Sequence, residues 1–290
     1  MTAKRRGRRL KKAIAWLILA LSIVVMVVYG RELRAVEMTY QEGNESYEQL
    51  TANVRPGGLP VFHAAQATHA KETYIEGTHI EETAGDLSGV VLAAPLRPQI
   101  AIPDMAIDFA ALKAINADSA AWLYSPDTVI DYPVMRATDY SYYLQHLPNG
   151  SLNANGSLFI DYNCAPDFSD SLTIIYGHHM KSGRMFGSIV GYKKQAYFDA
   201  HPNMYLYTAD GSYRIDLIYG CVIGAGQWRE RAFMFKENLD SLLTYAAHNT
   251  TFSSDVAYAE GDRVVALSTC SYEFDNARYL VIGVLRPEFG

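Results

Sequence analysis

The sequence Val264-Val265-Ala266-Leu267-Ser268-Thr269-Cys270 is an apolar run that ends on a cysteine, and Arg278 follows eight residues after it. Its β-branched and apolar residues predict a buried strand. If Tyr279–Leu285 is the second arm of a hairpin whose loop is centred on Phe274, Cys270 and Arg278 lie opposite each other on one face. A thiol beside a fixed positive charge is typical of a site where sulfur attacks a carbonyl and the guanidinium stabilises the developing oxyanion.

A second apolar run, Ile174-Ile175-Tyr176-Gly177-His178-His179, ends on two histidines. A cysteine thiol is mostly protonated at neutral pH, so a nucleophilic thiol needs a base. His178 is the best candidate, because it can take the thiol proton and later protonate a leaving amine, whereas His179 is expected to point elsewhere. Alone, each feature has a structural explanation: a buried inert cysteine, a turn, a surface arginine. Together they favour a catalytic site.

About eight short apolar segments follow Ile100, separated by turn signals such as Asn155-Gly156 and Ala209-Asp210-Gly211. This pattern, rich in Tyr, Val and Ile, predicts a mainly β fold, an antiparallel or mixed barrel. The expected strands are Ala121–Tyr124, Tyr132–Met135, Ser157–Tyr162, Leu172–Tyr176, Met204–Thr208, Arg214–Val222, Arg263–Thr269 and Tyr279–Leu285. The expected helices are Phe109–Asn116, with Asp108 as its N-cap, Tyr140–His146, Met185–Lys193 and Lys236–His248.

The first twelve residues hold seven basic side chains and no acid, and an uncharged, mostly apolar run follows from Ala13 to Tyr29. Its length lies at the short end of the roughly 17–25 residues that span a bilayer as a helix. The positive charge before the run predicts a cytoplasmic N-terminus. A cleaved signal peptide is the alternative, with Val28-Tyr29-Gly30 as an imperfect cleavage site, but the run is longer than a usual signal core.

The chain therefore divides into a basic cytoplasmic tail (1–12), a transmembrane signal anchor (13–30), an extracytoplasmic spacer (31–97) and a compact domain (98–290). A short helix near Glu37–Val54 is one option within the spacer. Without the seven basic residues of the tail, 18 Lys and Arg face 31 Asp and Glu, a net charge of about −13. Such a balance argues against nucleic acid as a partner.

The three cysteines, Cys164, Cys221 and Cys270, are an odd number for an exported protein, so a disulfide framework is not indicated. Cys164 and Cys221 can pair, or each can be a small buried apolar residue. Cys270 is the cysteine whose sequence context indicates reactivity.

The motifs around the candidate site resemble those of class B sortases. Leu267-Ser268-Thr269-Cys270 with Arg278 resembles the catalytic strand of that family, and the segment from Tyr176 to Gly187 resembles its histidine segment. The resemblance covers about residues 100–287. Its other motifs are Asn116-Ala117-Asp118, Ala121-Trp122-Leu123, Ile130-Asp131-Tyr132-Pro133-Val134, Asp139 through Leu144, and Gly156-Ser157-Leu158-Phe159-Ile160-Asp161.

This resemblance implies a sortase-type β-barrel with several peripheral helices, one of them between the strands near Val222 and Arg263. It implies a cysteine transpeptidase that cleaves a C-terminal sorting signal of secreted proteins through a thioacyl intermediate. Cys270 is then the nucleophile, His178 the acid and base, and Arg278 the oxyanion or substrate stabiliser. No cofactor and no metal are expected. The residues expected to bind the sorting peptide are Leu144, Ser268 and Thr269.

The resemblance implies that the acceptor is an amine of the cell-wall peptidoglycan; a pilin lysine is the alternative. It also implies that the enzyme lies in the cell membrane of a Gram-positive bacterium. Tyr140 stands where some class B members have Asn, and Ser271 where some have an acid, so the sorting motif stays open. The Gln227–Phe235 stretch is expected to line the peptide groove. A hydrolytic thiol peptidase and a non-enzymatic membrane-anchored scaffold are the other readings.

Overall fold

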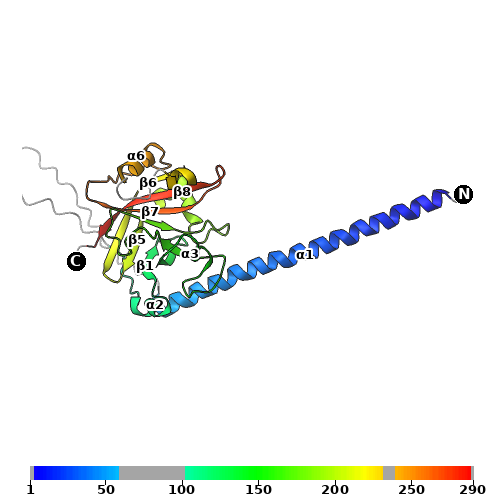
Figure 1. The fold of residues 1–290 in the computed structure, drawn as a ribbon, viewed down its shortest axis with the longest axis horizontal. Helices are drawn as coiled ribbons and strands as arrows, with labels where there is room; N and C mark the ends of the chain where they lie inside the picture. The colour runs from blue at the N-terminus through cyan, green and yellow to red at the C-terminus, as the bar shows by residue number, and fades with distance from the viewer. Residues whose placement is uncertain (1–2, 59–101, 231–238, 289–290) are drawn as a thin grey trace, which may run out of the picture.

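The computed structural model describes residues 3–58, 102–230 and 239–288, and within them eight strands form one closed barrel (Figure 1). Their order around the barrel is β1-β2-β3-β4-β7-β8-β6-β5. The predicted mainly β barrel is confirmed. The strands are β1 (Ser119–Tyr124), β2 (Asp131–Arg136), β3 (Leu158–Ile160), β4 (Leu172–Tyr176), β5 (Asn203–Thr208), β6 (Gly211–Gly224), β7 (Arg263–Cys270) and β8 (Ala277–Pro287).

The barrel is mixed: β2 pairs with β3 and β4 with β7 in parallel, and the remaining neighbours are antiparallel. Strands β4, β7 and β8 are buried on both faces. In β7, Val265 and Leu267 belong to the cluster that also holds Ile175, and Val264 and Ala266 belong to the cluster that α6 covers. Burial on both faces explains why these strands are continuous apolar runs instead of alternating ones.

Short helices surround the barrel. Asp108 caps α2, because its carboxylate accepts a hydrogen bond of 2.8 Å from the backbone N–H of Ala111, as predicted. Helices α5 and α6 lie between β6 and β7, where the resemblance implied a helical elaboration. The elements are α2 (Phe109–Ile115), α3 (Tyr142–Gln145), the 3₁₀ helix η1 (Ser188–Lys193), α4 (Gln195–Ala200), α5 (Ala225–Glu230) and α6 (Leu239–His248).

Helix α1 (Ala3–Val54) is one unbroken helix that extends away from the barrel (Figure 1). Among the described residues it is the one helix long and apolar enough to cross a membrane, and its apolar stretch from Trp16 onward is exposed, as expected of a membrane anchor. The sequence left open a short helix near Glu37–Val54. The structure instead continues the anchor helix through this region without interruption.

The last turns of α1 pack against the barrel. The buried residues are Gly43, Tyr47, Leu50 and Val54, whose spacing of four, three and four places them on one face of the helix. Part of the region expected to be a spacer is thus packed on the domain. The boundaries of the predicted segments stay predictions, since residues 59–101 lie outside the described residues.

Candidate active site

The hairpin of β7 and β8 places Cys270 opposite Arg278, which confirms the register predicted from the sequence. The loop is closed by the backbone N–H of Ser271, which donates to the Ala277 carbonyl over 2.9 Å. Arg278 is partly buried, and its Nη1 donates to the same carbonyl over 3.0 Å. The guanidinium is therefore held at the end of the strand beside the thiol.

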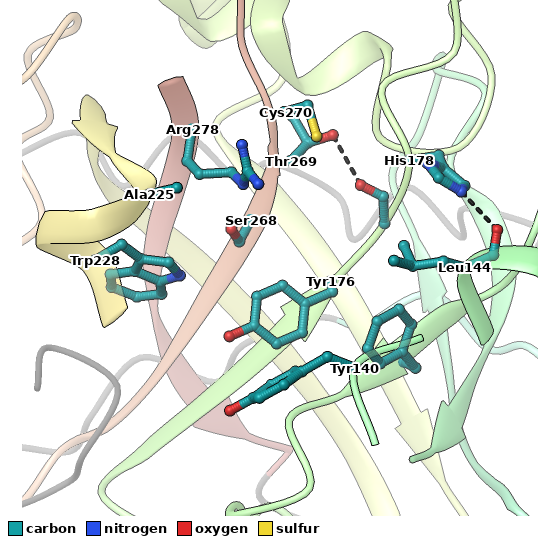
Figure 2. Close-up of a pocket in the computed structure, with 12 residues that line it drawn as sticks. Tyr140, Leu144, Tyr176, His178, Ala225, Trp228, Ser268, Thr269, Cys270 and Arg278 are labelled. Carbon is teal, nitrogen blue, oxygen red and sulfur yellow. Dashed lines mark hydrogen bonds between the residues drawn. The ribbon is translucent and has the colours of Figure 1, made fainter. Parts of the chain in front are cut away.

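Strand β4 runs parallel to β7, with Tyr176 paired to Ser268, so Gly177 and His178 leave the sheet next to Cys270. The Thr269 hydroxyl donates to the Gly177 carbonyl over 2.8 Å (Figure 2). A Cβ on Gly177 would lie 2.5 Å from the side chain of Leu158, so a larger residue does not fit there. The two strand ends are joined directly beneath the site.

Both histidines bind backbone carbonyls. His178 Nε2 lies 2.6 Å from the Leu144 carbonyl oxygen, and His179 Nδ1 lies 2.7 Å from that of Cys270. A carbonyl oxygen only accepts, so each of these ring nitrogens carries a hydrogen. On His178 this leaves Nδ1 as the nitrogen available for proton exchange. The contact of His179 with the backbone of Cys270 was not foreseen, because it depends on how two loops fold.

Cys270, Arg278 and His178 line one pocket of about 120 Å³, and His179 is not part of its lining. In the view of Figure 2, Cys270 is drawn between Arg278 and His178. All six residues that the sequence nominated are among its lining. The full set is Tyr140, Leu144, Phe159, Tyr176, Gly177, His178, Ala225, Trp228, Ser268, Thr269, Cys270 and Arg278.

An aromatic wall that the sequence did not indicate closes one side of the pocket. The rings of Tyr140 and Tyr176 meet edge to face, with centroids 5.9 Å apart. Burial raises the pKa of the Tyr176 phenol, and the nearby Asp161 carboxylate raises it further. The phenol therefore keeps its proton and donates to Asp161 over 2.9 Å.

Two buried polar groups in the pocket lining have no hydrogen-bond partner among the described residues: the indole N–H of Trp228 and the hydroxyl of Ser268. Each residue is 2 % exposed. Burying a polar group without a partner costs free energy, so both groups are suited to bind a ligand. Trp228 belongs to the Gln227–Phe235 stretch that was expected to line the groove; residues 231–238 lie outside the described residues.

The loop after Cys270 is tied to η1. Lys193 Nζ donates to the Ser271 hydroxyl over 2.9 Å and also contacts the Glu273 carboxylate. Although partial burial opposes it, the hydrogen bonds from Lys193 and Ser271 hold the pKa of Glu273 below its usual range. The Ser271 hydroxyl also contacts the Glu273 carboxylate, so an acidic side chain lies beside the residue that follows Cys270.

None of the three cysteines, Cys164, Cys221 and Cys270, forms a disulfide. Burial raises the pKa of the Cys221 thiol to about 12, so it stays protonated. Within the described residues, Cys270 is the cysteine that lines the pocket.

Comparison with known proteins gives one consistent result, although no protein-family model matches the chain. Sortase B of Listeria monocytogenes is 31% identical over 178 residues, which are 60% of this chain and 72% of that protein. The structure of Clostridium perfringens sortase B is 29% identical, with a TM-score of 0.55 over 60% of this chain and 97% of that one.

A Staphylococcus aureus sortase B–substrate complex is 24% identical and shares the fold, with a TM-score of 0.57 over 62% of this chain and 85% of that chain. The eight-stranded barrel with its peripheral helices is therefore the fold of sortase B. The chain belongs to the class B sortases and is a cysteine transpeptidase of that family.

Proposed function

We propose that this transpeptidase uses Cys270, His178 and Arg278 to cleave a C-terminal sorting signal of secreted proteins. The Cys270 sulfur attacks the scissile carbonyl carbon, and the Arg278 guanidinium donates hydrogen bonds to the oxyanion. His178 protonates the leaving amine, and a thioester remains on Cys270. An acceptor amine then attacks the thioester, gives up a proton to His178 and releases the thiolate.

The observation that carries this proposal is the pairing of Cys270 with Arg278 across the β7–β8 hairpin, in one pocket with His178. A fixed guanidinium suits an oxyanion because it is always charged and presents several donors in a fixed geometry. The hydrogen on His178 Nε2 is bound to a carbonyl, so proton transfer is assigned to Nδ1.

We assign Leu144, Ser268 and Thr269 to the binding of the sorting peptide. All three line the pocket, and the Ser268 hydroxyl has no partner among the described residues. We add the Trp228 N–H, which is in the same situation. These two donors suit an oxygen of the peptide. Thr269 contributes through its backbone and methyl group, because its hydroxyl is bound to Gly177.

The acceptor that we propose is an amine of the cell-wall peptidoglycan, and a pilin lysine is the alternative. The N-terminus is cytoplasmic in this proposal and the barrel lies outside the membrane, because seven basic residues precede the apolar run. A single-pass anchor would keep the enzyme at the surface where sorting signals and cell-wall precursors meet.

The test uses the full chain in detergent micelles with a panel of quenched sorting peptides, with and without triglycine, and mass spectrometry of the products. We expect an amine-coupled product that depends on Cys270 and disappears in Cys270→Ala. Hydrolysis that triglycine does not divert would instead support a thiol peptidase. Absence of both turnover and a Cys270 adduct would support a scaffold.

A further inference from the structure

One face of the last turns of helix α1 packs against the barrel. From Trp16 to Met38 every residue except Gly30 is exposed, and further along the helix Gly43, Tyr47, Leu50 and Val54 are turned to the barrel. A helix that is exposed for most of its length and then buries one stripe is docked, not merely attached through the chain. Docking this close to the apolar run fixes the barrel on the anchor.

The first part of this face, from Thr39 to Tyr47, contacts the turn of residues 153–157, whereas Leu50 and Val54 pack in the cluster that holds Leu112 and Trp122. Asn153 Nδ2 donates to the Thr39 carbonyl over 2.8 Å, and Asn155 Nδ2 donates to the Tyr40 carbonyl over 3.3 Å. The Tyr47 hydroxyl, in turn, donates to the Gly156 carbonyl over 2.6 Å. The turn donates to two helix carbonyls and the helix donates to one turn carbonyl, so these hydrogen bonds fix the position of the helix along the turn.

Close approach is possible because the helix has a glycine at the contact. A Cβ on Gly43 would lie 2.3 Å from Asn155 Nδ2 and 2.7 Å from Asn153 Oδ1. Any larger residue would therefore displace the two amides that bind the helix backbone. The Tyr47 ring also packs edge to face on Tyr132, at 5.2 Å between centroids, so its hydroxyl is held in place.

The opposite side of the 153–157 turn binds the segment around α3. The backbone N–H of Asn153 donates to the Gln145 carbonyl over 2.8 Å, and that of Ser157 donates to the Tyr143 carbonyl over 2.7 Å. Gly156 has a φ of +59°, and a Cβ there would lie 2.7 Å from the Leu144 carbonyl oxygen. The turn therefore packs directly on the carbonyl that His178 Nε2 binds.

We propose that Tyr47 of the anchor helix is a positioning residue for His178. The docked part of α1 fixes the 153–157 turn, the turn fixes the Leu144 carbonyl, and that carbonyl fixes the orientation of the imidazole. The inference rests on the proposed function, in which His178 is the acid and base. It makes the anchor helix part of the catalytic unit as well as its attachment to the membrane.

The Tyr47 hydroxyl is suited to this role at every pH at which the enzyme works. Burial raises the pKa of the phenol, so it keeps the proton that it donates to Gly156. Without the Tyr47 hydroxyl, the Gly156 carbonyl loses a hydrogen-bond donor, and the turn is held less firmly next to Leu144. A small rotation of the imidazole moves Nδ1 relative to the reacting atoms, to which proton transfer is sensitive.

The test compares Tyr47→Phe with Tyr29→Phe in the full chain in lipid nanodiscs. Tyr29 lies on the same helix, is 63 % exposed in the apolar run and serves as the matched control. We expect Tyr47→Phe to lower kcat on the order of tenfold, with KM unchanged and an altered pH profile. Tyr29→Phe should match the wild type. The ¹⁵N-labelled imidazole resonances of His178, assigned with His178→Gln, should shift only in Tyr47→Phe.

Unchanged kcat and unchanged His178 resonances in Tyr47→Phe would overturn the inference, even if the melting temperature falls. The imidazole resonances need no turnover. An inactive wild type with a Tyr47-dependent shift would therefore refute the proposed function and keep the positioning contact. If Tyr47→Phe does not fold, Asn155→Ala carries the same test, because it removes the bonds to Tyr40 and Asn44 and leaves the aromatic packing intact.

Discussion

The two sides of the active site are held in different ways. Cys270 and Arg278 are neighbours across a single hairpin and lie eight residues apart in the chain. His178 is oriented by the carbonyl of Leu144, which packs on the 153–157 turn, which in turn is bound by α1. The pairing of Cys270 with Arg278 comes from one hairpin, whereas the orientation of His178 depends on contacts between four separate segments. The thiol side should therefore tolerate distant substitutions that the histidine side does not.

The largest effect is expected from Arg278→Ala. Removing a donor to an oxyanion costs on the order of 100-fold to 1,000-fold in rate, so kcat/KM should fall by that amount. The side chain is partly buried and its hydrogen bond is to its neighbour's carbonyl, so the melting temperature should change little. Steady-state kinetics with a cleavable peptide and thermal unfolding measure the two quantities.

Arg278→Lys is the matched control for this substitution. Lysine keeps the charge but not the planar fork of donors, so it should restore only part of the rate. Full activity of Arg278→Lys would show that charge alone matters. Full activity of Arg278→Ala would contradict the assignment of the oxyanion to this residue.

The second largest effect is expected on stability, from removing the ion pair that follows helix α1. Arg55 follows the helix and binds Asp131 through two hydrogen bonds of 2.7 and 2.8 Å, with 5% of its side chain exposed. Breaking a buried ion pair from one side costs about 3 kcal/mol, because the other charge stays buried without its partner. Asp131→Ala should lower the free energy of unfolding by that amount, measured by chemical denaturation of the full chain in micelles.

Asp131→Asn separates charge from hydrogen bonding, because its amide oxygen can still accept from Trp122 Nε1, which lies 2.7 Å from Asp131 Oδ1. We expect a smaller loss of stability than in Asp131→Ala. Equal losses would assign the effect to the charge alone. Wild-type stability in Asp131→Ala would show that α1 is held by its apolar stripe and not by this pair.

The sequence predicts the Cys270 side of the site well and the His178 side poorly. The apolar run to Cys270, the spacing to Arg278 and the turn signals predict the barrel and the hairpin, because strand pairing and alternation are local rules. The partners of His178 do not follow from such rules. Its carbonyl partner, Leu144, lies 34 residues away, and nothing in the periodicity of either segment links them.

The docked face of α1 was present in the sequence but was not recognised. Gly43, Tyr47, Leu50 and Val54 have helical spacing, yet only two are large aliphatic residues, and the surrounding residues are polar. A glycine and a tyrosine weaken a hydrophobic stripe as a pattern, although both are needed for close contact here. The contact of His179 with Cys270 likewise depends on loop folding and had no sequence signal.

A third prediction tests the 153–157 turn with two glycines. Gly156 and Gly150 both have positive φ, +59° and +81°, but only a Cβ at Gly156 would meet backbone, at 2.7 Å from the Leu144 oxygen. Gly150→Ala should cost about 1 kcal/mol of stability from backbone strain. Gly156→Ala should cost about 2 kcal/mol and also lower kcat, because the clash moves the carbonyl that orients His178.

Thermal unfolding and steady-state kinetics of the two alanine variants give the comparison. The difference between them isolates the clash, since the left-handed strain is common to both. If Gly156→Ala loses stability but keeps its kcat, the turn does not control the histidine, and the comparison between the two sides of the site fails at this contact.

The smallest effect is expected where the two sides meet. Thr269 lies in β7 beside Cys270, and its hydroxyl donates to the carbonyl of Gly177, the residue before His178. Thr269→Val keeps the shape and removes one buried hydrogen bond, which costs about 1 kcal/mol. Thr269→Ser keeps the hydroxyl and removes only a methyl group. We expect Val to lower both kcat and the melting temperature, and Ser to keep kcat close to that of the wild type, since the link between the strands survives. Equal losses in the two variants would mean that the methyl packing, and not the hydrogen bond, joins the thiol side to the histidine side.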